Sequence, residues 1–263
     1  PLQSATEDPE QVQTENHESN NATQTVKESQ NTAEQKPFDT KMQEAKEIFY
    51  DYHNNTDNFQ KSIDILNSII SEHPNDPEAY IFLSRVWLTY GHLIRESGTP
   101  EKWERFKKGS EIAQKAIKLD PSDPNAYFNY VANEASLAKS KGVFGSVFLV
   151  KRLKKGINKV LELDPEHVEG IALKGAILNS IPGLLGGDVK EAESLLRKAL
   201  ALDPHLTSTK IFLAKNLYKQ EQYNDAKTLF NEVLQEENPT IRCDWHLNRR
   251  TAIKWLRIID NEH

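Results

Sequence analysis

The sequence has a single cysteine, Cys243, few glycines and no long apolar run. One cysteine excludes an intrachain disulfide and any zinc site built from several thiolates. No segment approaches the roughly 18 consecutive apolar residues that indicate a membrane-spanning helix. Eleven glycines in 263 residues, together with few runs of β-branched residues, favour helices over strands.

Catalytic signatures are missing as well. The eight histidines are scattered, and none belongs to an HExxH motif or to a close pair of metal ligands. Asp244 and His246 follow Cys243 closely, but such neighbours on one helix do not by themselves arrange a nucleophile and its base. We therefore expect a protein that is not an enzyme and that binds no metal and no cofactor.

The formal net charge of −6 comes almost entirely from the N-terminal segment. Residues 1–38 hold seven acidic side chains against Lys27 and Lys36. The remainder carries 32 acidic and 31 basic residues. This balance argues against nucleic acid as a partner.

Residues 1–37 are predicted to be a disordered polar tail. They consist mostly of Gln, Glu, Asn, Ser and Thr, and they bury too little apolar surface to offset the entropy of ordering. The printed chain starts at Pro1. A polar leash at this position suits an exported protein, periplasmic or lipid-anchored, with a lipidated cysteine just upstream. A weakly ordered end that was trimmed is the other interpretation.

From residue 38 onward the sequence repeats a pattern in which a proline follows one amphipathic helix and precedes the next. Four segments show it: "EHPNDPEAYIFL", "KLDPSDPNAYFNY", "ELDPEHVEGIAL" and "ALDPHLTSTKIFL". The prolines, with a fifth in "EENPTI", are Pro74, Pro121, Pro165, Pro204 and Pro239. Two further Asp-Pro pairs, Asp76–Pro77 and Asp123–Pro124, are typical of a helix start, in which the aspartate is the N-cap and the proline is in the first turn.

This pattern resembles the tetratricopeptide repeat, a helix–turn–helix unit of about 34 residues. Aligned on the prolines, one bulky position of each first helix holds Tyr80, Tyr127 or Ile171, with Lys210 as a departure. A small position four residues later holds Ser84, Gly175 or Ala214, with Val131 as a departure. The resemblance covers residues 38–238. It implies an all-α, right-handed solenoid of about five helix pairs, and we expect a further helix at 243–261 to cap the last pair, so that 38–263 form one domain.

The repeats are longer than the family unit, and the extra residues fall between the first and second helices of a pair. The joints are "GHLIRESGTPEKW", "KSKGVFGSVFLVKRLKK" and the apolar turn "NSIPGLLGGD". Insertions of this kind emerge along one edge of a solenoid, often the binding edge. Leu184 and Leu185 of the apolar turn are therefore candidate binding residues. A phosphate-binding glycine loop is rejected, because no strand precedes the glycines and no GK[ST] follows them.

One of these joints is strongly basic. No acidic residue occurs between Glu134 and Glu162, and the cluster Lys151, Arg152, Lys154 and Lys155 lies beside the apolar "VFGSVFL". Basic groups next to an apolar patch suit peripheral contact with a membrane surface or an acidic partner. An ordinary helix with a solvated lysine face is the alternative.

In this repeat class the first helices line a concave groove. The groove positions predicted here are Ile81, Arg85, Leu88, Phe128, Ala132, Ala172, Ala176, Ile211, Lys215 and Tyr218. Few of them are charged, which suits an apolar ligand or a segment of a protein partner. Tight packing that buries the alanines is the alternative.

The sequence therefore predicts a non-catalytic binding or assembly module that holds a protein partner in this groove. The elongated joints and the "PGLLGGD" turn also resemble the periplasmic T-component lipoproteins associated with TRAP-type transporters. That resemblance implies the alternative function, a carrier of a lipid or other small hydrophobic ligand. The sequence leaves the partner, the ligand and the possibility of an oligomer open.

Overall fold

The computed structural model describes residues 38–96, 98–143 and 146–262, and in this part of the chain all regular structure is helical. Five helix pairs follow one another, and a single long helix comes after them. The pairs are 38–50 with α2 (Asn58–Glu72), α3 (Pro77–Leu93) with α4 (Pro100–Leu119), α5 (Pro124–Lys141) with α6 (Val147–Leu163), α7 (Val168–Ser180) with α8 (Val189–Leu202), and α9 (Thr207–Lys219) with α10 (Tyr223–Gln235). The long helix is α11 (Arg242–Glu262), and the short η1 (Gly183–Leu185) precedes α8. The predicted all-α solenoid is confirmed; the predicted tail, 1–37, lies outside the described residues.

The helix starts are fixed locally, as the Asp-Pro pairs predict. The side chain of Asp76 accepts a hydrogen bond from the amide of Glu78 at the start of α3. The side chain of Asp188 accepts bonds from two amides, those of Lys190 and Glu191, at the start of α8. These bonds satisfy amides that have no partner within the first turn of a helix.

The small position of the repeat lets the two helices of a pair approach closely. A Cβ atom added to Gly175 would lie 2.8 Å from Leu196 of the paired helix. In the second pair the hydroxyl of Ser84 donates a 2.8 Å bond to the carbonyl of Gly109, which ties α3 to α4. Both positions are buried, so larger side chains there would push the pair apart.

The extra residues of the middle repeats mainly lengthen helices instead of forming long joints. Of the basic segment, only 142–146 lies between α5 and α6, and the lysines on either side belong to the helices. The joint between α3 and α4 is likewise reduced to 94–99. These stretches continue the helical pattern of buried apolar positions and so extend the helices. Gly142, with φ at +70°, ends α5, and Pro100 is the first residue of α4.

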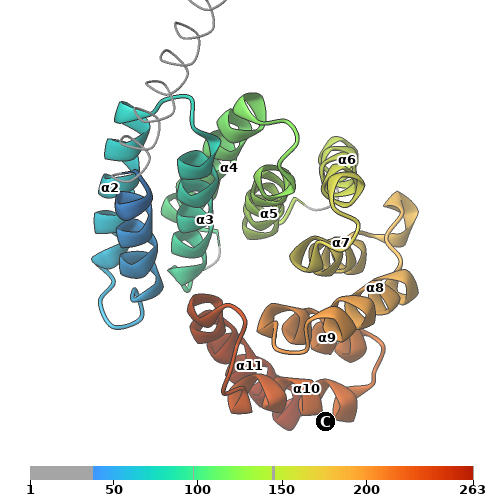
Figure 1. Ribbon diagram of the computed structural model, residues 1–263. Coiled ribbons are helices and arrows are strands. Elements are labelled where there is room, and N and C mark those ends of the chain that lie inside the picture. Colours follow the sequence, from blue (N-terminus) through green and yellow to red (C-terminus); the bar gives the residue numbers. More distant parts are fainter. Residues whose placement is uncertain (1–37, 97, 144–145, 263) are drawn as a thin grey trace, which may run out of the picture.

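Figure 1 shows the helix pairs arranged along an arc, with α11 closing the arc at the bottom so that it returns to the side of α3. The helices bury three successive apolar clusters, the first around Phe49 and Phe59, the second around Leu153, and the third around Phe230. Each cluster combines side chains from neighbouring pairs, as expected for stacked repeats.

Helix α11 does more than cap the last pair. Its C-terminal part packs on α9 and α10 as predicted, with Ile259 buried there. Its N-terminal part contacts the first pair, where the hydroxyl of Tyr52 donates a 2.7 Å bond to the carbonyl of Cys243. The rings of His53 and His246 stack beside this bond with centroids 4.0 Å apart. A single helix therefore joins the two ends of the solenoid.

Candidate functional site

The concave face and α11 line a half-open cavity of about 870 Å³. This volume lies within the range of ligand pockets. Side chains from α3, α5, α7, α9 and α11 converge on it, with Lys102 and Phe106 added by α4. Its apolar lining includes Leu88, Phe106, Phe128, Leu173, Ile177, Ile211, Phe212 and Trp255.

Seven of the predicted groove residues line this cavity: Arg85, Leu88, Phe128, Ala132, Ala176, Ile211 and Lys215. Arg85, Ala132, Ala176 and Lys215 occupy the same register position in four successive first helices, five residues after the bulky position. Repetition of one position along a stack of helices places its members side by side on the inner face.

The other candidate residues do not line the cavity. Ala172 is fully buried in the third apolar cluster, and Tyr218 faces α11, where its hydroxyl donates a bond to Glu262. Ile81 lies nearer the N-terminal end of α3, and its carbonyl accepts a bond from Asn129. Leu184 and Leu185 lie on the η1 turn, outside the cavity lining. The concave face is covered by α11 and not by the insertions.

Arg85 holds α11 against the concave face. Its guanidinium lies 2.8 Å from a carboxylate oxygen of Glu169 on α7 and 2.5 Å from one of Asp244 on α11. Burial disfavours the cation, but the carboxylates of Asp244 and Glu169 raise the pKa of Arg85 above its usual value. This three-residue ion cluster thus joins the second pair, the fourth pair and α11.

The remaining cations of the cavity lack such partners. Lys139, Lys215 and Lys254 come from α5, α9 and α11, and none forms an ion pair with a described residue. Desolvation, together with the charges of Lys139 and Lys254, lowers the pKa of Lys215 to about 7. Desolvation and Lys254 also lower the pKa of Lys139. The three ammonium groups therefore repel one another across the cavity.

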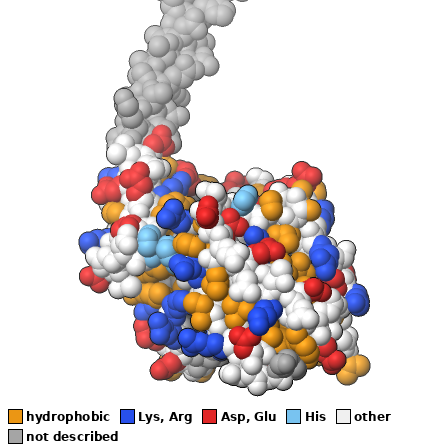
Figure 2. All heavy atoms as spheres, turned by 90° about the horizontal axis from the view of Figure 1, so that it is seen from below, with side chains coloured by type: hydrophobic (Ala, Val, Ile, Leu, Met, Phe, Trp, Pro, Cys, Tyr) orange, Lys and Arg blue, Asp and Glu red, His pale blue; other side chains and the backbone are white. Residues whose placement is uncertain are grey.

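More cations surround these three. The cavity lining also includes Arg95, Lys102, Arg250 and Arg257, and its acidic members, Glu169 and Asp244, are already paired with Arg85. His92 lines the cavity as a neutral ring, because burial lowers its pKa to about 3. Figure 2 shows Lys and Arg side chains gathered toward the lower left of the face seen from below, the side on which α11 lies in Figure 1. The cavity is therefore both apolar and positively charged, whereas the sequence predicted few charges.

The lengthened helices supply part of the cavity lining, namely the cation of Lys139 and the neutral ring of His92. Helix α9 ends nine residues after its bulky position, at Lys219, but His92 and Lys139 lie twelve residues after theirs. His92 therefore lies on the extra turn of α3, and Lys139 lies on that of α5. The two extra turns are in contact, because the hydroxyl of Ser136 on α5 lies 3.1 Å from the ring of His92. The long spacing of the prolines indicates the extra turn, but the sequence does not predict that the side chains of this turn face α11.

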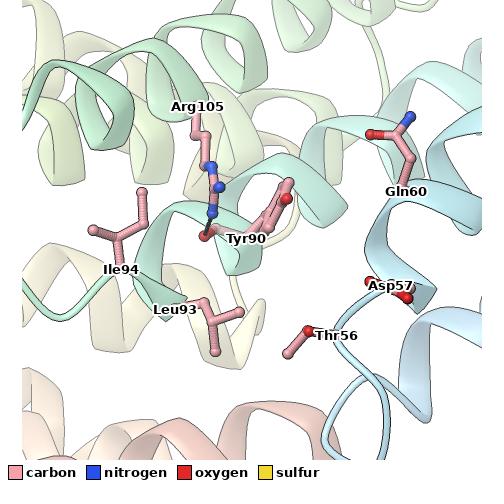
Figure 3. Close-up of a pocket in the computed structure, with 7 residues that line it drawn as sticks. All are labelled: Thr56, Asp57, Gln60, Tyr90, Leu93, Ile94 and Arg105. Atoms are coloured by element: carbon pink, nitrogen blue, oxygen red, sulfur yellow. Dashed lines mark hydrogen bonds between the residues drawn. The ribbon is translucent and has the colours of Figure 1, made fainter.

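A smaller cavity of about 350 Å³ lies between the start of α2 and the end of α3, with Arg105 reaching in from α4 (Figure 3). The guanidinium carbon of Arg105 is 3.4 Å from the ring centroid of Tyr90, and the group also donates a 3.0 Å bond to the Tyr90 carbonyl. An ion pair with Glu101 completes its contacts. The acidic residue of its lining, Asp57, is exposed to solvent, so no buried charge among the described residues marks this cavity as a site.

Two further candidate chemistries find no support in the geometry. Cys243 is buried, and burial and the adjacent Asp244 raise the pKa of its thiol, so it is not a thiolate nucleophile. Among the described residues no cluster of three His, Cys, Asp or Glu side chains has a metal-binding arrangement. No described helix is long and apolar enough to span a bilayer.

The predicted basic cluster divides into two kinds of side chain. Arg152 pairs with Glu134 and Lys154 donates a 2.7 Å bond to the carbonyl of Gly186, so both have structural partners. Lys151 and Lys155 are exposed on α6 and have no ion-pair partner among the described residues. All four lie outside the cavity lining.

Comparison with known proteins agrees with this architecture. A family model of the tetratricopeptide repeat matches residues 184–243. The solved structure of a thermophilic tetratricopeptide repeat protein from Thermus thermophilus superposes with a TM-score of 0.57 at 16% identity, over 81% of this chain and 99% of that one. Residues 184–243 thus match a tetratricopeptide repeat, and the chain shares the fold of the Thermus protein.

One further solved structure and one protein related in sequence are also similar to this chain. PilF of Pseudomonas aeruginosa superposes with a TM-score of 0.50 at 17% identity, over 86% of this chain and 94% of that one. A DnaJ homolog subfamily C member 7 homolog of Schizosaccharomyces pombe is 27% identical over 120 residues, which are 40% of this chain but 24% of that protein. The chain thus spans about a quarter of that relative. Together the comparisons suggest a protein-interaction or scaffold module.

Proposed function

We propose that this tetratricopeptide repeat protein is a non-catalytic binding module that holds an acidic, partly apolar segment of a protein partner in the cavity between its concave face and α11. The observation that supports this function is the set of unpaired lysines, Lys139, Lys215 and Lys254, beside an apolar lining. Carboxylates entering the cavity relieve the repulsion among these lysines, while apolar side chains cover the remaining surface.

The charges favour a protein segment over the alternative, a carrier of a small hydrophobic molecule. An uncharged lipid would cover the apolar lining, leave Lys215 desolvated without an anionic partner, and leave its repulsion with the more exposed Lys139 and Lys254 unrelieved, which is unfavourable. A peptide segment offers carboxylates and apolar side chains at short intervals. The structure of the cavity therefore matches a mixed ligand better than a purely apolar one. Export and lipid anchoring remain predictions from the polar tail.

A tryptophan at Ala176 tests whether ligands enter the cavity. Ala176 lines the cavity from α7, so the indole of Ala176→Trp is expected to fill part of its volume. A random peptide library displayed on phage is selected on the wild-type protein, and each selected peptide is then measured against the variant. We expect acidic peptides with apolar residues whose affinity falls at least tenfold in Ala176→Trp.

The matched control places the same side chain on the outer surface. Lys198→Trp, at an exposed position of α8, is expected to retain the wild-type affinity. Thermal unfolding separates blocking from misfolding, because overpacking of a filled site costs about 1–3 kcal/mol. Selected peptides that bind both variants alike, or a library without any binder, would contradict the proposed function.

A further inference from the structure

A second surface, outside the cavity, is marked by apolar side chains that point into solvent. Among the described residues, Leu184 is 102% exposed and Phe148 is 87% exposed, by far the most of any large hydrophobic side chain. Val143 and Val147 are also exposed, so half of the exposed large hydrophobic residues belong to two short segments, 143–148 and the η1 turn. Scattered exposed leucines are ordinary, but a concentration of them marks an interaction site.

The two segments are neighbours in space although they belong to different helix pairs. The ammonium group of Lys154 on α6 donates a 2.7 Å bond to the carbonyl of Gly186 at the end of η1. Val147 lies seven residues before Lys154, two turns along the same face of α6, and Phe148 directly follows Val147. Figure 1 shows α6 and the turn before α8 side by side at the right-hand edge. We call the surface formed by Val143, Val147, Phe148 and Leu184 the apolar edge.

The exposure of Leu184 is built into the turn. The amides of Leu185 and Gly187 both donate to the carbonyl of Pro182, at 2.9 and 3.1 Å, and the amide of Gly186 donates to Gly183. Gly186 has a φ of +81°, which glycine adopts without strain. Leu185 packs inward against the apolar cluster around Leu153, and this leaves its neighbour Leu184 pointing outward. The hydrogen bonds of the turn therefore fix the backbone that carries the exposed side chain of Leu184.

The side of the apolar edge formed by α6 is positively charged. No acidic residue occurs between Glu134 and Glu162, and the ion pair with Arg152 engages Glu134. Lys151 and Lys155 follow Phe148 at spacings of three and seven residues, so they lie on the same face of α6. Both are exposed and have no ion-pair partner in the described chain. The edge thus combines protruding apolar groups with free cations.

We infer that the apolar edge, together with Lys151 and Lys155, is a contact surface for an anionic lipid bilayer. The lysines are complementary in charge to acidic headgroups, and the protruding Phe148 and Leu184 reach the acyl boundary between those headgroups. A bilayer accepts protruding side chains by local rearrangement, whereas a folded partner needs a preformed pocket for each. This inference rests on residues outside the cavity and stands independently of the proposed function.

Vesicle sedimentation tests the inference. We expect the wild-type protein to sediment with vesicles of phosphatidylcholine and phosphatidylglycerol at low salt, and much less with phosphatidylcholine alone. The double variant Phe148→Ser, Leu184→Ser is expected to lose at least tenfold in partitioning. The double variant Lys151→Glu, Lys155→Glu is expected to lose a similar amount, and high salt is expected to weaken the wild type.

Matched variants control for general changes of surface. Leu119→Ser with Leu202→Ser removes two exposed leucines elsewhere, and Lys115→Glu with Lys198→Glu makes the same charge change elsewhere. Both controls are expected to bind vesicles like the wild type, and all variants are expected to keep the wild-type melting temperature. These are surface substitutions, which rarely change stability much.

Three results would overturn the inference. The first is a wild-type protein that does not sediment with the anionic vesicles. The second is a serine double variant that binds as well as the wild type, which would show adsorption by charge alone. The third is self-association that depends on Phe148 and Leu184 in light scattering, without vesicle binding, which would show that a second copy of the chain covers the edge.

Discussion

Replacing Arg85 by methionine is expected to lower the melting temperature by about 6–12 °C, which corresponds to a loss of about 3 kcal/mol in a domain of this size. The guanidinium bridges Glu169 of α7 and Asp244 of α11, and all three side chains are largely shielded from solvent. Burial, with a contribution from Glu169, raises the pKa of Asp244 even though Arg85 opposes the rise. Without Arg85 the two carboxylates face each other unpaired, and this penalty destabilises the docking of α11.

Neutralising the stranded carboxylates separates this mechanism from a simple loss of packing. The triple variant Arg85→Met, Glu169→Gln, Asp244→Asn is expected to recover most of the lost stability, because no buried charge remains without a partner. Thermal unfolding followed by circular dichroism measures both proteins. If Arg85→Met alone melts within about 2 °C of the wild type, a shift that about 1 kcal/mol or less produces, the ion cluster does not hold α11.

Replacing Lys215 by methionine is expected to change stability in the opposite direction. Desolvation and two nearby lysines lower the pKa of Lys215 to about 7. A group whose pKa is depressed by folding favours the folded state at high pH, and this advantage disappears as the pH falls toward the folded pKa. The wild type should therefore lose stability from about pH 10, near the unfolded lysine pKa, down to pH 7.

The Lys215→Met variant should show a flatter pH dependence over this window and a melting temperature at pH 7 about 2–4 °C higher than the wild type, as a stabilisation of about 1 kcal/mol gives. Lys198→Met, at an exposed site on α8, is the control for loss of a lysine and should change neither quantity. An unchanged pH profile in Lys215→Met would show that the ammonium is not strained in the cavity.

The same variant is expected to bind acidic peptides at least tenfold more weakly, because a hydrogen bond to a charged group contributes roughly 1.5–3 kcal/mol. A more stable protein that binds less well is the signature of a functional site, since the lysine is unfavourable until a ligand neutralises it. Higher stability with unchanged peptide affinity would instead place the ligand away from α9. Titration calorimetry of the peptides selected on the wild type gives the affinities.

Much of the fold was predictable because its determinants are local. Asp76 and Asp188 cap helices through bonds to amides two or three residues away, and Pro77 and Pro124 occupy first helical positions, where a proline is tolerated. The period of the repeat then places one register position of each first helix on the inner face. Arg85, Ala132, Ala176 and Lys215 were found in this way, and all line the cavity.

The positive charge of the cavity was not predictable, because it depends on where α11 lies. Sequence alone determined the class of the helices, their pairing, their caps and the inner face of the solenoid, since those follow from short-range spacing. Only the tertiary structure decided that α11 crosses to Tyr52 and Arg85 and brings Lys254 next to Lys139 and Lys215. These contacts join residues far apart in the chain, and no local pattern encodes their geometry. The charge of the cavity is therefore a property of the closed ring and not of any single repeat.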